Sequence, residues 1–289
     1  ALSAGKKVKL NSEFVWDSLS LAVKGALQCV QQQCSIDNGA FNVNGQSLTG
    51  NLKAAFGGAK PVIEADLSAG ALDISAFMAK KQASHSLIKP AYAADARWSA
   101  APIDFSFANA IQGTVKLAVD KLIANAFSAE KIVLSARFTG QSLAIDAQSG
   151  GLYQGQGTLK ATIGAGGSVE SAVNLQAVQL EPLLTALSGS SDLAGKLNGK
   201  LNVRTSGKNE QQLVGNLSGS GDVRVADGKI KGVNLAGMVR NIQSAYKDVD
   251  KSARSTDFTE AGGSFTIAQG IVTNNDFAMK APLFRVTGK

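Results

Sequence analysis

Apolar and polar residues alternate with a period of two along most of this chain. Val115, Leu117 and Val119, for example, are separated by a lysine and an alanine. Similar segments follow, and glycine clusters separate them at intervals of about 8–12 residues. A period of two places the apolar side chains of a strand on one face of a sheet. The pattern therefore predicts a mainly β protein built from hairpins, with an antiparallel sheet and a few short helices.

One set of apolar residues occupies the alternating positions of these segments and defines the expected apolar face. Two interpretations stay open for this set: it lines an exposed groove, or it forms an ordinary closed core. An uncovered apolar face of this size would be a binding surface. The residues are Val115, Leu117, Val119, Ile132, Leu134, Phe138, Leu143, Ile145, Leu201, Val203, Val223, Val225, Ile230, Phe265, Ile267, Phe277 and Met279.

The dipeptide Asp227-Gly228 has the composition of a two-residue type I′ turn. A hairpin around it would pair Val225 with Ile230 and Arg224 with Lys231. Val225 and Ile230 would then share the apolar face, and the two cations would share the polar face. We expect solvation to offset the like-charge contact between the cations.

Helical periodicity is confined to short stretches. Residues 234–249 repeat apolar side chains at i, i+3, i+4 and i+7, which predicts an amphipathic helix with Asn234 as its N-cap. Shorter helices are expected at 74–81 and 181–187. Residues 13–25 are also compatible with a helix. No apolar run approaches the roughly 20 residues that a membrane-spanning helix needs.

A segment of the chain is repeated. Residues 50–57 (GNLKAAFG) match residues 157–164 (GTLKATIG) at an offset of 157 − 50 = 107, and the flanking apolar positions follow. Repetition at such a period is typical of stacked or extended β architectures. We expect a first β-rich unit with short helices at 1–79 and a connection at 80–101. A second unit would cover 102–188 and a C-terminal β region 189–289.

The composition excludes several kinds of chemistry. The single histidine, His85, lies in the expected connection, so a catalytic triad has only one candidate base and a histidine-rich zinc site cannot form. Nucleophile-elbow, dinucleotide-binding and phosphate-loop motifs are absent. The net charge of +7 comes from scattered cations without interleaved aromatic residues. This argues against nucleic-acid binding. The sequence predicts neither enzymatic activity nor a metal or other cofactor.

The two cysteines, Cys29 and Cys34, offer the only covalent cross-link. In an oxidising compartment they would close a small loop, whereas in a reducing one they would be a buried thiol pair. Their spacing is not that of a redox C-x-x-C motif. We favour the disulfide.

The C-terminal third carries a set of ordered motifs. Residues 219–235 (GSGDVRVADGKIKGVNL) are followed by residues 263–267 (GSFTI), 270–274 (GIVTN) and 281–288 (APLFRVTG). Upstream, residues 60–67 (KPVIEADL) belong to the same pattern. In order and spacing this set resembles the AsmA family, over roughly residues 35–289. The chain departs from that pattern by lacking an N-terminal membrane helix and by ending at Lys289.

The resemblance implies a periplasmic protein of Gram-negative bacteria that acts in outer-membrane homeostasis. It implies a long, curved, gutter-like sheet with an apolar inner face, as in related bridge-like lipid carriers. Such a protein would be held in the inner membrane by an N-terminal helix outside this sequence. Phospholipids or other acyl lipids, bacterial membranes and outer-membrane assembly proteins are the partners that it implies.

Three functional hypotheses follow. The first is a non-catalytic segment that binds or conducts phospholipid along the apolar face. The second is a scaffold that modulates outer-membrane protein assembly through protein contacts, with its sheet folded on itself. The third is a polysaccharide-acting enzyme that uses scattered carboxylates. An open and elongated apolar face would favour the first hypothesis.

Overall fold

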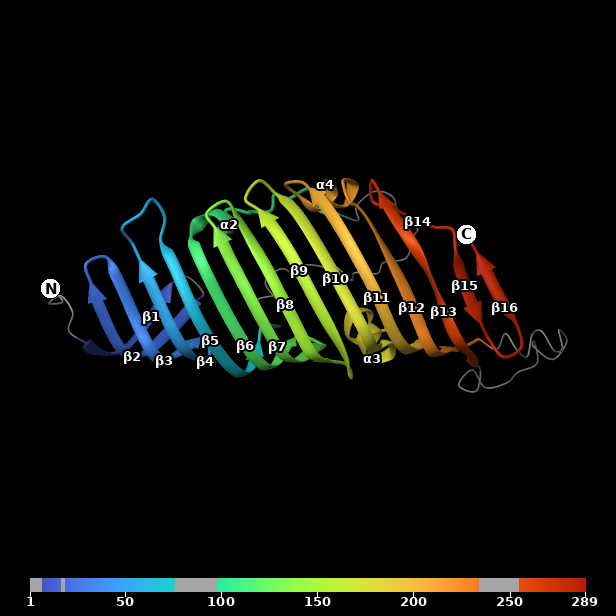
Figure 1. The fold of residues 1–289 in the computed structure, drawn as a ribbon, viewed down its shortest axis with the longest axis horizontal. Helices are drawn as coiled ribbons and strands as arrows, with labels where there is room; N and C mark the ends of the chain where they lie inside the picture. Colours follow the sequence, from blue (N-terminus) through green and yellow to red (C-terminus); the bar gives the residue numbers. More distant parts are fainter. Residues whose placement is uncertain (1–6, 17–18, 76–97, 234–254) are drawn as a thin grey trace.

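The chain forms one long, open and curved β-sheet (Figure 1). A computed structural model describes residues 7–16, 19–75, 98–233 and 255–289. In this part of the chain, sixteen strands lie side by side in sequence order, except that β14 pairs with β13 off the main path. The predicted β class, elongation and curvature are confirmed.

The strands are mostly ten residues or longer. They are β1 (Lys7–Trp16), β2 (Leu19–Val30), β3 (Gln33–Val43), β4 (Gln46–Ala55), β5 (Val62–Asp73), β6 (Gln112–Ala124), β7 (Phe127–Thr139), β8 (Ser142–Leu152), β9 (Gly155–Gly164), β10 (Ser168–Gln179), β11 (Leu193–Ser206), β12 (Ser218–Lys231), β13 (Ser255–Ala268), β14 (Ile271–Asn274), β15 (Phe277–Lys280) and β16 (Arg285–Gly288). The helices are α2 (Phe107–Ala110), α3 (Leu180–Ser188) and α4 (Glu210–Gly215). Among the described residues, no helix is long and apolar enough to cross a membrane.

The sequence predicts an antiparallel sheet, but one pair of neighbouring strands, β5 and β6, is parallel. Parallel neighbours need a crossover connection, and residues 74–111 provide it. The described end of this connection follows one rim of the sheet towards β6. There Ile103 N–H donates to Lys208 O at 2.8 Å, and Gln211 N–H donates to Ser99 O at 3.3 Å. These hydrogen bonds tie the crossover to the α4 region, beside β11, from where the chain continues to β6.

The predicted hairpin at Asp227-Gly228 is wrong, because both residues lie inside the continuous strand β12. They oppose the single residue Gly195 of β11, so they form a β-bulge, and Asp227 has a φ of 50°. The extra residue shifts the alternation by one position. Val225 and Ile230 therefore share a face after all, paired with Leu197 and Leu193 of β11. Pairing with two long neighbours overrides the local turn preference.

The predicted cation contact is wrong as well. Arg224 lies opposite Asn198 and Gly262, and its guanidinium pairs with Glu260 at 2.9 Å. Lys231 pairs with Glu181 at 2.6 Å. Because β12 is one continuous strand, Arg224 and Lys231 do not face each other, and each pairs with a different carboxylate.

The helix predictions had mixed outcomes. Residues 13–16 fall in β1 and residues 19–25 in β2, so a helix there is wrong: Val23 pairs with Phe41 of β3, and both are buried. Burial against the sheet favours the extended conformation over the weak helical pattern. The helix at 181–187 is confirmed as α3, which ends in the left-handed residue Gly189 (φ 73°). The helix at 234–249 lies outside the described residues, as do nearly all of 74–81 and His85.

The two copies of the repeat occupy equivalent pairs of neighbouring strands. The first copy lies in β4 and β5, and the second in β9 and β10. After the second copy the chain enters α3 and then pairs antiparallel through β11, whereas after the first it crosses over to the parallel strand β6. The predicted division of the chain at residues 79, 101 and 188 stays a prediction. All the described strands join one sheet.

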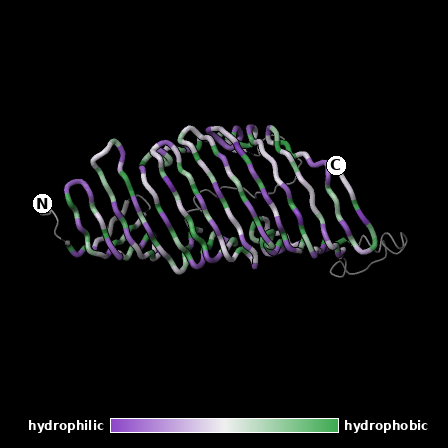
Figure 2. The backbone as a smooth tube through the Cα atoms, in the orientation of Figure 1, coloured by the Kyte–Doolittle hydropathy of each residue, from purple (hydrophilic) through white to green (hydrophobic). Residues whose placement is uncertain are grey.

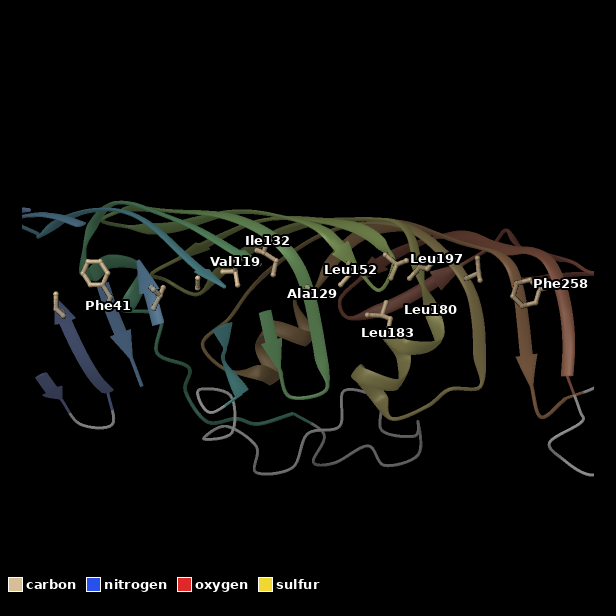
Figure 3. Packing of buried hydrophobic residues seen from close by; sticks show 14 of the residues in the cluster. Phe41, Val119, Ala129, Ile132, Leu152, Leu180, Leu183, Leu197 and Phe258 are labelled. Atoms are coloured by element: carbon tan, nitrogen blue, oxygen red, sulfur yellow. The ribbon is translucent and has the colours of Figure 1, made fainter. Parts of the chain in front are cut away.

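The buried apolar residues gather on one side of the sheet. Figure 2 shows apolar and polar residues alternating along the strands. Figure 3 shows the labelled side chains of Phe41, Val119, Ile132, Leu197 and Phe258 on the inner side of the curve, where α3 also lies. A disulfide joins Cys29 to Cys34 across the β2–β3 hairpin, where the two residues pair directly.

Candidate functional site

A row of apolar side chains crosses the middle strands of the sheet. Residues that pair directly across strands project from the same face. Leu117 pairs with Leu134, and the pairing continues strand by strand as far as β11. We call this row the apolar ladder; it consists of Leu117, Leu134, Ala147, Leu159, Val173 and Leu201. The ladder runs across the strands, along the length of the molecule.

Rows on either side of the ladder extend the same face, which we call the inner face. Val115 leads through Ala136 to Ile145, and Val119 pairs with Ile132. Towards the C-terminus, Gly221 pairs with Phe265, Gly219 with Ile267, Val225 with Ala261, and Ala261 in turn with Met279. By this register, the apolar set predicted from the sequence lies on the inner face. Whether those residues contact a ligand stays a prediction.

The inner face is covered near both strand ends but not in the middle. At one end, Leu180 and Leu183 of α3 pack in one buried cluster with Leu152 and Leu197. At the other end, α2 contacts β7, β8 and β9 and buries Ala108 completely. Between these helices the ladder leucines are only partly buried, and Leu159 is 37% exposed. Partly exposed leucines in the middle of a sheet show that, within the part of the chain that the structure describes, no second layer covers the ladder itself.

The strip carries no charge. The positions in register with Val115, Leu117 and Val119, followed from β6 through β12, contain no Asp, Glu, Lys or Arg. The opposite face, which we call the outer face, carries charged residues between these rows. They are Lys116, Arg137, Asp146, Lys160, Glu170, Lys200, Arg204, Asp222 and Arg224. Along these rows the sheet therefore separates an uncharged strip from a charged outer face.

A hollow on the outer face has a different character. It has a volume of about 1200 Å³ over β7–β13, and its lining mixes charged side chains such as Arg137, Lys160 and Glu170 with smaller apolar ones such as Val133 and Ala172. Lys160 pairs with Asp146 at 3.6 Å, and Arg204 Nε donates to Ser218 Oγ at 3.4 Å. Charged and hydroxyl groups of this kind favour water or a polar ligand over hydrocarbon.

The described carboxylates with shifted pKa values are not poised as general acids. Hydrogen bonds from the Ser264 side chain and backbone, with a smaller contribution from Asn274, lower the pKa of Asp276. Ser75 and Ser106 similarly lower the pKa values of Asp73 and Asp104. A general acid at neutral pH needs the opposite shift. In the described ranges, no group of three or more His, Cys, Asp or Glu residues is arranged to hold a metal ion.

Some inner-face residues were missed from the sequence. Leu159 and Val173 belong to the ladder, although residues 157–164 were used only to identify the repeat. The alternation of polar and apolar residues in Thr158-Leu159-Lys160 is the same as in β6, and it could have predicted that Leu159 lies on the apolar face. Leu187 of α3 had no such signal, because only tertiary structure places this helix over the inner face.

Comparison with known proteins identifies the family. The sequence model of the AsmA family matches residues 9–277, most of the chain and nearly all of the sheet. Neither the curated proteins nor the solved structures provided a match. With its open, curved sheet and this match along its length, the chain belongs to the AsmA family.

Proposed function

We propose that this chain is a non-catalytic periplasmic carrier that holds the acyl chains of phospholipids on its inner face, between the inner and outer membranes. One observation carries the proposal: the apolar ladder lies in an uncharged strip, and none of the described residues forms a second layer over the ladder. Membership of the AsmA family is consistent with a role in lipid transport and outer-membrane homeostasis.

The dimensions of the ladder suit acyl chains. From Leu117 in β6 to Leu201 in β11 the ladder crosses five strand spacings, about 24 Å at 4.8 Å each. Half of a bilayer's hydrocarbon core, the depth of one acyl chain, is about 15 Å. Each methylene group transferred from water to this strip would contribute about 0.8 kcal/mol. The polar headgroup would stay outside the strip, in water.

The cellular location is part of the same proposal. The disulfide between Cys29 and Cys34 supports an oxidising compartment such as the periplasm. We place the full-length protein at the inner membrane, held by an N-terminal helix outside this sequence, as the family resemblance implies.

The alternatives have less support. A scaffold with its sheet folded on itself would bury the inner face, and the described sheet is open. A carboxylate-based enzyme would need an acid with a raised pKa, whereas each shifted pKa among the described carboxyl groups is lowered. We therefore propose lipid binding ahead of both.

Native mass spectrometry of the protein after mild purification tests the proposal. We expect bound phospholipid at near-stoichiometric occupancy, with acyl composition resembling that of the host membranes. Delipidated protein incubated with phosphatidylglycerol vesicles and re-isolated should regain this lipid. Protein that stays empty under both conditions, while its circular dichroism is that of a folded β-sheet, would contradict the proposal.

A further inference from the structure

Helix α3 lies over the inner face and is attached mainly through its first turns. Leu180 is 6% exposed and Leu183 is 8% exposed, and both pack in the buried cluster with Leu197 of β11. Glu181, in the first turn, pairs with Lys231 at the end of β12 at 2.6 Å. The start of the helix is therefore fixed to the sheet by apolar packing and by an ion pair.

The last turn of α3 differs from the first. Leu187 follows Leu180, Leu183 and Leu184 at helical spacing, so it belongs to the stripe that faces the sheet. Leu187 is nevertheless 44% exposed. A leucine on the sheet-facing stripe of a helix keeps that exposure only where the helix and the sheet leave room for water. The end of α3 thus overhangs the inner face without closing onto it.

The direction of the helix connects this overhang to the ladder. Starting next to β10 and β11, α3 also contacts β7, so it passes back across the intervening strands. The uncharged strip crosses the same strands, and Ile132 and Leu175 of its edge row pack in or against the buried cluster that contains Leu180 and Leu183 of α3. The exposed side chain of Leu187 therefore extends the apolar surface from the edge of this strip onto α3.

We infer that α3 is a roof over part of the lipid-binding strip, and that a phospholipid acyl chain passes beneath its last turn in contact with Leu187. This inference rests on the proposed function and adds a second contact surface to it. A chain held between the edge of the strip and α3 is buried on two sides, whereas elsewhere along the strip it is buried on one. Lipid should therefore reside longest beneath α3.

Site-specific photo-crosslinking tests the inference. The photo-reactive amino acid benzoylphenylalanine replaces Leu187, Thr185, Leu159 or Val133 in four separate variants, which are incubated with phosphatidylglycerol vesicles, irradiated and analysed by mass spectrometry. Leu159 reports on the ladder. Thr185 is a control on the same helix, exposed on another side of it, and Val133 is a control on the outer face, where it is 62% exposed.

Each outcome decides a different point. Lipid adducts at Leu159 and Leu187, at least five times more abundant than at Thr185 and Val133, are expected. Adducts at Leu159 without Leu187 would leave lipid binding in place and overturn the role of α3. Equal adducts at Leu187 and Thr185 would also overturn it, since they indicate adsorption to the helix surface. The absence of adducts at both Leu159 and Leu187, with the variants folded, would contradict the proposed function itself.

Discussion

The ring of Phe258 lies directly over Gly228, its partner across β12 and β13. A Cβ atom added at Gly228 would stand 2.0 Å from Phe258 Cζ. Phe258 is itself only 3% exposed, so the ring has little room to move away. The bulge at Asp227-Gly228 thus supplies both the shift in alternation and the bare backbone on which this aromatic side chain packs.

Replacing Gly228 with alanine should therefore destabilise the sheet. We expect the Gly228→Ala substitution to lower the free energy of unfolding by about 1–3 kcal/mol, the range for overpacking a core. Chemical denaturation followed by circular dichroism measures it. Gly166→Ala is the matched control, because a Cβ there meets no atom within 4 Å, and its effect should be small. Equal effects of the two substitutions would contradict the packing role of Phe258.

Charge on the uncharged strip should reduce lipid binding strongly without unfolding the protein. A carboxylate in place of Leu117 would lie in the uncharged strip, where an acyl chain would have to desolvate it. We expect Leu117→Glu and Ile145→Glu to reduce lipid occupancy in native mass spectrometry by tenfold or more. Because both residues are only partly buried, their circular dichroism spectra should remain those of a folded sheet.

The control for the ladder substitutions is Val133→Glu. Val133 is an exposed aliphatic residue of β7 on the outer face, so the new carboxylate stays in water. Lipid occupancy should match that of the unsubstituted protein. Global unfolding by Leu117→Glu would instead indicate that the inner face is a closed core.

Loss of the disulfide should affect stability more than function. Cys29 and Cys34 close a short loop, with a sequence separation of 5, and a loop this short limits the entropic stabilisation to about 2 kcal/mol. The double substitution Cys29→Ser and Cys34→Ser should lower the denaturation midpoint modestly. Lipid occupancy should be unchanged, since β2 and β3 lie outside the ladder. A loss of bound lipid in this variant would show that the N-terminal strands contribute to the site.

The carboxylate of Asp276 should make the C-terminal strands sensitive to acid. It accepts hydrogen bonds from Ser264 N–H and Ser264 Oγ, both at 2.8 Å, and these lower its pKa from 3.8. A group with a depressed pKa in the folded state contributes its stabilisation in full above 3.8 and loses it as the pH falls through the folded-state pKa.

Comparison with Asp276→Asn isolates this contribution. The unsubstituted protein should be the more stable of the two at neutral pH, and the difference should shrink as the pH falls below 3.8. Denaturant midpoints measured across this range provide the test. A difference that stays constant with pH would show that the ionised carboxylate is not responsible.

Several features followed from the sequence for local reasons. The alternation in β6, β7 and β8 predicted the strands themselves and also their apolar faces, because successive side chains of a strand point to opposite sides of the sheet. The stripe in α3 was recognisable because its leucines follow helical spacing around Pro182 at the start of the helix. The ordered motifs of the C-terminal third identified the family that the comparison then showed.

Other features depended on partners that lie far away in the sequence. Asp227-Gly228 has ideal turn chemistry, yet β11 and β13 pair along both sides of β12 and hold it extended. The parallel pairing of β5 with β6 has no local signal, since strand direction depends on the route of the connection. Near the N-terminus, pairing within the sheet likewise outweighs the weak helical pattern of residues 13–25.

The sequence by itself determined which residues are apolar on each strand and that the protein is a β-sheet of the AsmA type. Only the tertiary structure decided that the strands form one open sheet, with helices near both strand ends and, among the described residues, no layer over the ladder between them. The physical reason is that alternation specifies the face of each strand but not what covers that face. Coverage depends on where α2 and α3 pack, and those contacts join residues far apart in the chain.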